Sequence, residues 1–458
     1  MLHDRVYTYK MLADGILAVS AILHELGLDR TRPVGILVSA PGRHLIVLLA
    51  LLRNGFAFAS LRNDIIGVAL AQGVDQVIAD EFLPPLPGLR TTMVEDKWFA
   101  RKPASAPPPV EADENQIVQI RFSSGSTGVP KAFGRTGPVF QKRIALKYVT
   151  GEAARSRFLT TVGLSGSALT YVMRVLMDGN TVFFASQEYA LGSMFAWGVE
   201  EARVSAGQAR ELLAQRATLG YDVKLALLSV GAATLSTALE QDLRRTFGCE
   251  IINTYASTEG GVMALAAGNV LRMRAQKGNC FVPLARFQIV DDEGRPLPPG
   301  VEGRIRVQHD MASRVFEGDL FNHRSVAPDG WITTGDLGVI DEDGFIIVRG
   351  RADEVINLGG VKLNPEILED LLRRNTTTAN AAVVRVAGPE GDHEVWLALP
   401  GPISPGALQS VNDWIVRRGT GELAAARIAR IVQVDHIPLT AAGKVARAQL
   451  RAMLLASP

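Results

Sequence analysis

Residues 123–131 read Ser-Ser-Gly-Ser-Thr-Gly-Val-Pro-Lys and directly follow an apolar, strand-like stretch from Ile117 to Phe122. Small residues leave the backbone N–H groups of such a loop uncovered, and the hydroxyls of its serines and threonine add further hydrogen-bond donors. The lysine at the end places one positive charge where a polyanion would lie. The stretch therefore predicts a loop that holds the phosphates of a nucleotide.

The loop differs from the Walker A motif of P-loop NTPases. That motif requires Gly-Lys-Ser/Thr, whereas Pro130 and Ala132 flank Lys131 in this sequence. Both the turn before the helix and the hydroxyl that would bind magnesium are therefore missing. An ordinary Gly-Ser turn of a β-hairpin remains the alternative for this stretch taken alone, because Gly, Ser and Pro are common turn residues.

Four further motifs follow along the chain. They are Tyr-Ala-Ser-Thr-Glu-Gly at residues 255–260, Trp-Ile-Thr-Thr-Gly-Asp at 331–336, Gly-Arg-Ala-Asp at 350–353 and Pro-Leu-Thr-Ala-Ala-Gly-Lys at 438–444. In this order and at these separations, the five motifs resemble those of the acyl-adenylate-forming (AMP-binding) superfamily, which includes acyl-CoA synthetases, peptide-synthetase adenylation domains and firefly-type luciferases. The resemblance runs from about Tyr7 to Arg451, nearly the whole chain.

The resemblance implies an enzyme that uses ATP and Mg²⁺ to convert a carboxylic acid to its adenylate, with release of pyrophosphate. Thr258 would contact the α-phosphate, Glu259 would bind Mg²⁺, and Lys444 would be the catalytic lysine. The β- and γ-phosphates would be held by Ser123, Ser124, Gly125, Ser126, Thr127, Gly128 and Lys131. These residues supply the positive charge and hydrogen-bond donors that a reaction between two anions requires.

The resemblance also assigns the rest of the nucleotide site and a path for the thiol. Tyr255 would lie against the adenine, and Asp336 and Arg351 would bind the ribose hydroxyls. The small domain would swing about Asp353, and the paired glycines would guide a pantetheine arm. Those glycines are Gly359 and Gly360, and two more nucleotide-site residues are Gly231 and Ala232.

The acyl pocket is expected from segments that match the family's substrate site. Its candidate lining is Leu164, Ser165, Gly166, Ser167, Gly231, Ala232, Ala233, Gly261, Val262 and Met263. These small, mostly apolar residues favour an uncharged acyl or aryl group. Residues 163–171 contain no acid to hold an α-ammonium group, so an α-amino acid is disfavoured, and the histidine that many acyl- and aryl-CoA ligases carry there is also absent.

Each assignment has a structural alternative when the residue is taken alone. Glu259 could be part of a helix-capping pair, Asp336 a turn residue and Arg351 a solvated surface residue. Lys444 in isolation would be an exposed lysine. The Gly359-Gly360 pair could be a plain turn as readily as a ligand contact. The complete series of motifs decides for the functional interpretation.

Composition excludes several other classes of protein. The 458 residues are 47% hydrophobic and carry a formal net charge of +1, with 48 Lys and Arg against 47 Asp and Glu. This balance argues against nucleic-acid binding. Cys249 and Cys280 are the only cysteines, so we expect two small core residues in a reducing compartment, with the cytoplasm as the default location. The sequence shows no secretion signal and no stretch that would span a membrane.

Alternating strand and helix patterns predict an α/β protein. The spacing predicts helices over 9–26, 42–53, 168–177, 193–202 and 236–247, and strands over 34–38, 56–61, 76–79, 158–162, 181–184, 224–230 and 250–255. The proline-rich residues 83–109 read as a surface connection, and residues 286–348 as β-rich. We expect a large N-terminal domain over 1–351, with two doubly wound α/β layers and a small barrel-like sheet. A smaller mobile α+β domain over 352–458, with two helices and short strands, would carry Lys444.

Three functions remain open. The first is an AMP-forming acyl-CoA synthetase that transfers the acyl group to CoA. The second loads an acyl or aryl acid onto the phosphopantetheine of a carrier protein. The third is a nucleotide-binding relative without catalysis, which the presence of Lys444, Glu259 and Thr258 disfavours. The shortened N-terminus leaves open whether a homodimer forms.

Overall fold

In the residues that it describes, the computed structural model has thirteen α-helices and large β-sheets in a mixed α/β architecture, which confirms the predicted fold class. It describes residues 6–83, 85–100, 107–111, 113–122, 131–146, 156–164, 168–231, 234–277, 279–316, 330–358, 361–373, 381–387, 393–419, 423, 425–439 and 445–456. The chain forms two compact units. The first unit comprises Met1–Ala185, Ser257–Gly261 and Gln308–Ile332, and the second comprises Ser186–Ala256, Val262–Val307 and Thr333–Pro458.

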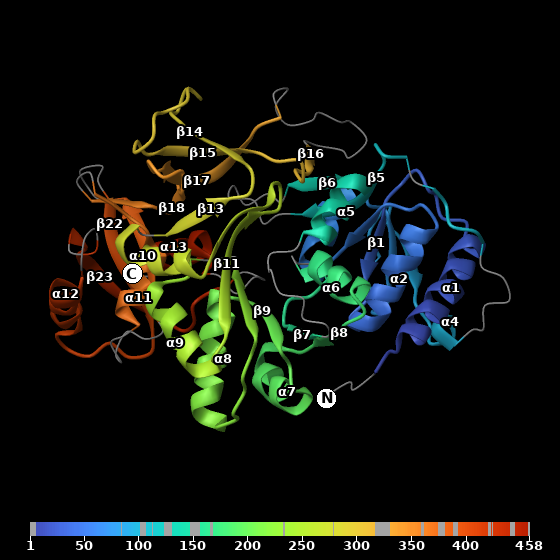
Figure 1. Cartoon of the computed structure of the whole chain (residues 1–458), viewed down its shortest axis with the longest axis horizontal. Coiled ribbons are helices and arrows are strands. Elements are labelled where there is room, and N and C mark those ends of the chain that lie inside the picture. Colours follow the sequence, from blue (N-terminus) through green and yellow to red (C-terminus); the bar gives the residue numbers. More distant parts are fainter. Residues whose placement is uncertain are drawn as a thin grey trace. The chain divides into compact units, whose positions relative to one another are not determined.

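The first unit is built on a seven-stranded sheet of order β16-β6-β5-β2-β1-β3-β4, in which five neighbouring strands are parallel. Its elements are α1 (Tyr9–Glu25), β1 (Val34–Leu37), α2 (Pro41–Arg53), β2 (Phe58–Ser60), η1 (Asn63–Ile65), α3 (Ile66–Ala71), β3 (Gln76–Ala79), β4 (Arg90–Met93), α4 (Lys97–Ala100), β5 (Ile117–Phe122), β6 (Ala132–Thr136), α5 (Gly137–Ala145), β7 (Arg157–Thr160), α6 (Ala168–Met177), β8 (Thr181–Phe184) and β16 (Arg314–Phe316). α1 packs against α2 and α4 beside the strands (Figure 1).

Local sequence explains the start of the first unit. The Thr8 hydroxyl accepts a hydrogen bond from the backbone N–H of Met11, so Thr8 is the N-cap of α1. Gly27, just beyond the helix, has φ +61°, a conformation that favours glycine. Neighbouring residues of β2 enter different buried clusters: Phe58 packs in one with Leu48, and Ala59 in another with Val77. The parallel strands thus lie between apolar layers, as their sequence pattern predicts.

The second unit contains a mixed sheet of order β14-β15-β17-β18-β13-β12-β11-β10-β9. Its strands β9 to β11 are parallel, and the pairings β12–β13, β13–β18 and β17–β18 are antiparallel. Up to residue 351 its elements are η2 (Gln187–Tyr189), α7 (Ala190–Trp197), β9 (Glu201–Ser205), α8 (Ala206–Leu219), β10 (Leu227–Gly231), α9 (Thr237–Phe247), β11 (Glu250–Ser257), β12 (Gly261–Ala267), α10 (Asn269–Lys277), β13 (Cys280–Pro283), β14 (Arg286–Val290), β15 (Gly303–Gln308), β17 (Ile332–Ile340) and β18 (Ile346–Arg351). The β-rich stretch expected over 286–348 therefore continues this sheet beyond β13.

Residues after 351 in the second unit carry their own hydrophobic clusters. One contains Ile356, Leu397 and Ile415, and another contains Ala398, Val432 and Leu450, with every buried member drawn from this part of the chain. The elements are β19 (Ile356–Leu358), β20 (Val361–Leu363), α11 (Pro365–Leu372), β21 (Ala382–Ala387), β22 (His393–Pro400), α12 (Ala407–Arg418), β23 (Ile428–Val434) and α13 (Arg447–Ala456). The boundary near residue 352 and its mobility stay predictions.

The structure corrects several expected elements. The predicted surface connection over 83–109 contains β4, which is the edge strand of the first sheet, and α4. The helix expected over 193–202 ends at Trp197, with Gly198 in the left-handed conformation as its cap, and β9 begins at Glu201. α8 was not expected, although Ser205 and Gln208 form a capping box at its start. After residue 351 the described residues contain α11, α12 and α13 rather than two helices.

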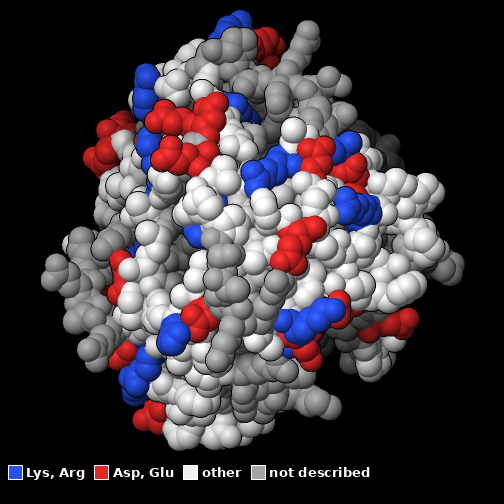
Figure 2. Space-filling model, turned by 90° about the vertical axis from the view of Figure 1, so that its right-hand side faces the viewer, with Lys and Arg blue, Asp and Glu red and all other residues white. Residues whose placement is uncertain are grey.

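The cysteines and the surface agree with the composition. Cys249 and Cys280 are buried and unpaired with each other, as expected for core residues. Figure 2 shows acidic and basic side chains interspersed on the face that it presents. Among the described residues, no helix is both long and apolar enough to cross a bilayer.

Candidate functional site

Three of the predicted motif loops lie outside the described residues, but hairpin stems on both sides of each are described. The phosphate loop, with Ser123, Ser124, Gly125, Ser126, Thr127 and Gly128, is one of them. It joins β5 to β6, which pair antiparallel from Ile117↔Thr136 to Phe122↔Ala132. Lys131 stands at the start of β6 and is exposed. The stem therefore brings the two ends of the loop together.

The loop that carries Lys444 also lies outside the described residues, and its stem is held in a similar way. Leu439 and Val445 form an antiparallel bridge, and the N–H of Ala446 donates to the carbonyl of Pro438 at 2.8 Å. Arg447 follows at the first position of α13 and is 5% exposed. The residues on the two sides of this loop are therefore held next to each other.

Gly359 and Gly360, also outside the described residues, connect β19 to β20. Leu358 and Val361, the described residues on either side of them, are antiparallel partners. The role of the two glycines in the thiol path stays a prediction.

In the second unit the structure brings together three motif residues from separate segments. The Tyr255 hydroxyl donates to Asp336 Oδ2 at 2.6 Å and lies 3.4 Å from Thr334 Oγ1. Arg351 Nη1 lies 4.0 Å from Asp336 Oδ1, and β17 and β18 pair Asp336 with Arg351. Burial, and then the nearby Asp336 carboxylate, raise the pKa of Tyr255 well above its usual value. Tyr255 therefore remains a hydrogen-bond donor that orients the carboxylate.

Gly335 explains how Arg351 approaches this cluster. A Cβ atom at residue 335 would lie 2.1 Å from Arg351 Nη1, so any side chain there would displace the guanidinium. Arg351 Nε also donates to Asp353 Oδ1 at 3.1 Å, which connects the predicted ribose-binding arginine to the predicted hinge residue. The Gly-Asp and Gly-Arg-Ala-Asp motifs thus form one arrangement of carboxylates and a cation.

In the first unit, the predicted catalytic residues Thr258 and Glu259 lie in a turn in which Ser257 Oγ accepts a hydrogen bond from the N–H of Gly260 at 2.9 Å. Both side chains are partly exposed. Their backbone carbonyls are held from behind. Arg143 Nη2 donates to the Glu259 carbonyl at 2.7 Å, and Arg143 Nη1 lies 3.3 Å from the Thr258 carbonyl.

Arg135 and Ser313 complete this arrangement, which sequence reasoning missed. The N–H of Ser313 donates to the Glu259 carbonyl at 2.7 Å, and its hydroxyl to the Thr258 carbonyl at 3.2 Å. Arg135 Nη2 lies 3.5 Å from the Thr258 carbonyl. Burial, together with the neighbouring cations Arg143 and Arg121, holds the pKa of Arg135 well below its usual value. The sequence signal that could have identified them is the presence of Arg135 and Arg143 among apolar residues of a strand and a helix after the phosphate loop.

The predicted acyl-pocket residues fall into described and undescribed sets. Ser165, Gly166, Ser167, Ala232 and Ala233 lie outside the described residues. Leu164, Val262 and Met263 are buried. Gly231, the last residue of β10, would place a Cβ 2.9 Å from Thr254 Oγ1. Gly261 has φ +76°, and its Cβ would lie 3.1 Å from Arg143 Cζ, so the space beside it is taken by that guanidinium.

Glu259 suits the predicted magnesium site in its donor chemistry. Mg²⁺ is commonly bound by one or two carboxylates together with substrate phosphates and water. Among the described residues there is no group of three or more His, Cys, Asp or Glu side chains that could hold a metal alone. A single partly exposed carboxylate therefore fits an ion that is shared with a triphosphate.

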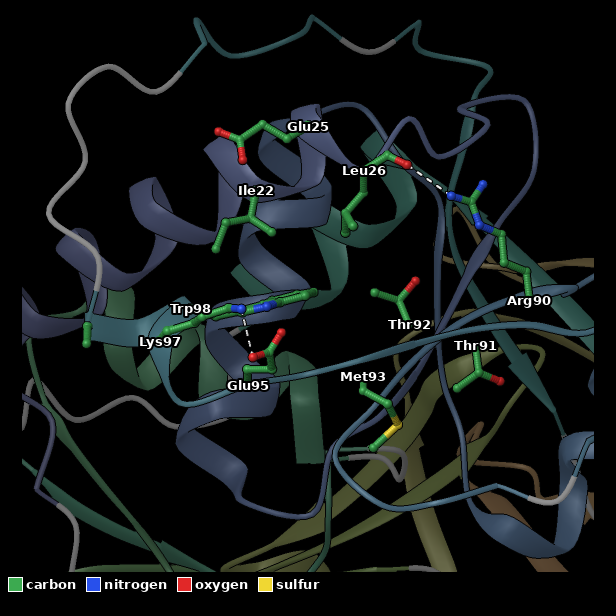
Figure 3. Close-up of a pocket in the computed structure, with 11 residues that line it drawn as sticks. Ile22, Glu25, Leu26, Arg90, Thr91, Thr92, Met93, Glu95, Lys97 and Trp98 are labelled. Atoms are coloured by element: carbon green, nitrogen blue, oxygen red, sulfur yellow. Dashed lines mark hydrogen bonds and ion pairs between the residues drawn. The ribbon is translucent and has the colours of Figure 1, made fainter.

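A cavity of about 890 Å³ lies in the first unit between α1, β4 and α4, apart from the motif residues. Figure 3 shows Ile22, Leu26 and Trp98 around it, with Arg90 donating to the Leu26 carbonyl at 3.0 Å. Its lining contains none of the predicted catalytic or nucleotide-binding residues. We assign it no part in the chemistry.

Comparison with known proteins gives consistent matches. The family model described as AMP-binding enzyme matches residues 2–316. Enterobactin synthase component E of Escherichia coli (strain K12) is 28% identical over 363 residues, which cover 76% of this chain and 66% of that protein. The fatty acid–[acyl-carrier-protein] ligase ScoC of Streptomyces coeruleorubidus is 24% identical over 371 residues, covering 77% and 70%. The chain thus spans about two thirds of the length of these relatives.

The fold matches solved structures over the whole chain. The anthranilate CoA ligase AuaEII, solved with anthranoyl-AMP, superimposes with a TM-score of 0.86 at 20% identity, covering 100% of this chain and 94% of that chain. At this identity the likeness shows a common fold.

Proposed function

Because the chain belongs to the AMP-binding enzyme family, we propose that it activates a carboxylic acid with ATP and then transfers the acyl group to the thiol of CoA. In the first step a carboxylate oxygen attacks the α-phosphorus, and the bond to the bridging oxygen of the β-phosphate breaks, which releases pyrophosphate. In the second step the thiol sulfur attacks the acyl carbonyl. The bond to AMP breaks, and a thioester and AMP leave.

The observation that carries this proposal is the convergence of Tyr255, Asp336 and Arg351 in the second unit. Tyr255 lies 81 positions from Asp336 in the sequence, whereas Asp336 and Arg351 are partners on the adjacent strands β17 and β18. A half-buried phenol that donates to a carboxylate fixes the carboxylate as an oriented acceptor pair, which suits the two hydroxyls of a ribose.

The charged parts of the reaction fall to other residues. Lys131 and the phosphate-loop donors would hold the β- and γ-phosphates, and Thr258 would contact the α-phosphate. Mg²⁺, held by Glu259 and phosphate oxygens, would neutralise charge on the triphosphate. Lys444 would stabilise the negative charge that develops between carboxylate and α-phosphate. Closure of the part that carries Lys444, with Asp353 as the hinge, would exclude water from the reactive anhydride.

A second acceptor stays in view, since CoA and a carrier protein present the same phosphopantetheine thiol. The relative ScoC is named as a ligase for an acyl-carrier protein, whereas the structural neighbour AuaEII is named as a CoA ligase. We propose CoA as the acceptor because AuaEII, which shares the fold over the whole chain, is named as a CoA ligase. For the acid, the small and mostly apolar residues predicted for the acyl pocket favour an uncharged acyl or aryl group.

The test is carboxylate-dependent pyrophosphate release across short, medium, branched and aromatic acids. Each acid is assayed alone, with CoA, and with a phosphopantetheine-bearing carrier protein. We expect pyrophosphate release with at least one uncharged acid and thioester formation with CoA. Thioester formed only on the carrier would replace the acceptor. ATP binding without pyrophosphate release for any acid would support the inactive relative.

A further inference from the structure

We propose that Arg143 is a positioning residue for adenylation, acting with Arg135 and Ser313 as a clamp on the backbone carbonyls of Thr258 and Glu259. The inference rests on the proposed function and adds to it a component that the five motifs do not contain. The carbonyl clamp, as we name Arg135, Arg143 and Ser313, belongs wholly to the first unit.

The guanidinium of Arg143 occupies the centre of the clamp. It is 9% exposed, and besides the two turn carbonyls it donates from Nε to the Met311 carbonyl at 2.8 Å and from Nη2 to Ser313 Oγ at 3.0 Å. A planar fork of N–H donors suits several carbonyls in fixed directions, which a lysine could not reach together. Hydrogen bonds from a charged donor are also stronger than neutral ones.

Arg135 ties the clamp to the phosphate loop. It lies in β6, the strand that begins just after Lys131, and its Nη1 donates to Gln119 Oε1 of β5 at 2.7 Å while its Nε lies 3.3 Å from Ser313 Oγ. Arg143 lies on α5, which directly follows β6. The two arginines therefore connect the stem of the phosphate loop to the turn that carries Thr258 and Glu259.

Ser313 joins the third segment to the same point. It precedes β16, whose residue Arg314 pairs with Gly134 of β6. Its backbone N–H and its hydroxyl donate to the Glu259 and Thr258 carbonyls respectively. Two parts of the first unit therefore fix the carbonyl side of the turn. One is Ser313 just before β16, which pairs with β6, and the other is α5, which carries Arg143.

Gly261 gives an independent sign that the sequence makes room for the clamp. A Cβ at residue 261 would lie 3.1 Å from both Cζ and Nε of Arg143, and the backbone φ of +76° is itself unfavourable for other residues. The glycine lets the turn pass close to the guanidinium. The clamp therefore accounts for a glycine whose place in the family motif suggested an acyl-pocket role.

Electrostatics support a role in phosphate chemistry. The acceptors that hold Arg135 among the described residues are neutral: an amide, a hydroxyl and a carbonyl. Carbonyl dipoles satisfy guanidinium donors without cancelling their charge. Arg135 consequently leaves positive potential behind the turn, and a triphosphate with Mg²⁺ beside Thr258 and Glu259 would be favoured by it.

The test compares Arg143→Gln, Arg143→Lys and Ser313→Ala with Lys142→Ala. Lys142 is the adjacent residue on α5 and forms an exposed ion pair with Asp310, so it controls for a change of charge on this helix. Measurements are carboxylate-dependent ATP–pyrophosphate exchange, the Mg²⁺ concentration for half-maximal exchange, melting temperature, and amide hydrogen exchange of residues 257–263.

We expect Arg143→Gln to lower pyrophosphate exchange about 100-fold, because displacements of about 1 Å at catalytic groups have effects of that size. The half-maximal Mg²⁺ concentration should rise, and the amides of 257–263 should exchange faster. Arg143→Lys should recover part of the activity, Ser313→Ala should cost about tenfold as one member of the clamp, and Lys142→Ala should match the wild type.

Two results would overturn the clamp. One is unchanged hydrogen exchange over 257–263 in Arg143→Gln, and the other is equal activity of Arg143→Gln and Lys142→Ala. If Arg143→Gln does not fold, Ser313→Ala decides by the same measurements. Failure of the proposed function looks different, since the wild type would then lack exchange with every acid. Faster amide exchange in the variant would in that case leave the clamp a purely structural feature and end its assignment to adenylation.

Discussion

Arg143 in the first unit and Arg447 in the second are both buried beside a predicted catalytic motif, but their partners differ in charge. Arg143 holds the Thr258–Glu259 turn through carbonyl and hydroxyl oxygens. Arg447, three positions after Lys444, pairs with the Glu369 carboxylate through Nη1 at 2.6 Å and Nη2 at 3.2 Å, and its Nε lies 3.2 Å from Glu354 Oε2.

The difference teaches what each arginine can contribute. The carboxylates of Glu369 and Glu354 compensate the charge of Arg447 and raise its pKa. This guanidinium therefore has little electrostatic attraction left for an anionic ligand. Arg135 of the clamp is held by neutral acceptors, which leave its charge beside the Thr258–Glu259 turn available to an anion. We therefore expect substitutions near Arg447 to affect folding first and substitutions of the carbonyl clamp to affect chemistry first.

The largest effect should come from Lys444→Ala. This substitution removes the predicted catalytic amine and leaves the nearby ion pair between Arg447 and Glu369 in place. Loss of the charge at the transition state should reduce adenylate formation by about 10³-fold. The melting temperature and ATP binding should change little. Pyrophosphate release near the wild-type rate would contradict the catalytic role of Lys444.

Arg447→Met tests the buried ion pair between Arg447 and Glu369. Removing Arg447 leaves the Glu369 carboxylate, 2% exposed, with Arg373 Nη2 at 3.4 Å as its remaining cation, and should lower the free energy of unfolding by about 3 kcal/mol, the lower end for a broken buried pair. Urea unfolding measures the change. The control is the double variant Arg447→Met, Glu369→Leu, which removes both charges and should recover much of the loss. Equal loss in single and double variants would show that the pairing matters less than side-chain packing.

Acidification tests another buried basic side chain of the first unit, His44, which contacts uncharged oxygen atoms. Buried His44 contacts the Val38 carbonyl through Nδ1 and Ser60 Oγ through Nε2, and burial lowers its pKa to about 4. The folded pKa lies below the unfolded value of about 6.5, so the unfolded state takes up the proton first. Stability from His44 is complete above about pH 6.5 and should fall by about 3 kcal/mol as the pH drops towards 4.

His44→Asn provides the measurement for that expectation. Urea unfolding of both proteins between pH 7 and pH 4 gives the difference in pH dependence, which removes the contribution of the carboxylates common to both. The wild type should lose more stability than the variant over this range. Parallel pH curves would mean that His44 titrates normally in the folded protein.

Tyr255→Phe should give the smallest change, because it removes one neutral donor from a carboxylate that keeps Arg351 nearby. We expect a loss of about 1.5–3 kcal/mol in stability, typical of a hydrogen bond to a charged group. The Michaelis constant for ATP should rise through the freed Asp336 carboxylate. An unchanged constant would argue against an oriented ribose acceptor, and Tyr7→Phe serves as the tyrosine control.

Local signals predicted much of the fold. The apolar spacing of α1 and α6 and the short, mostly apolar runs of β3 and β8 identified their elements closely, because each depends on neighbouring residues. α8 was missed because alanine, glutamine and arginine weaken its apolar pattern, although its capping box was present. β4 was missed because it is a four-residue edge strand within a proline-rich stretch, and only its pairing with β3 identifies it as a strand.

The motif order by itself indicated the family, the reaction class and the residues expected at its centre, since such loops carry their chemistry in residue type and spacing. Only the tertiary structure decided that Tyr255, Asp336 and Arg351 meet, and that Arg143 holds carbonyls more than a hundred positions away along the chain. Backbone carbonyls are the same at every residue, so no sequence pattern marks which of them a distant arginine will bind. That choice follows from how strands and helices pack.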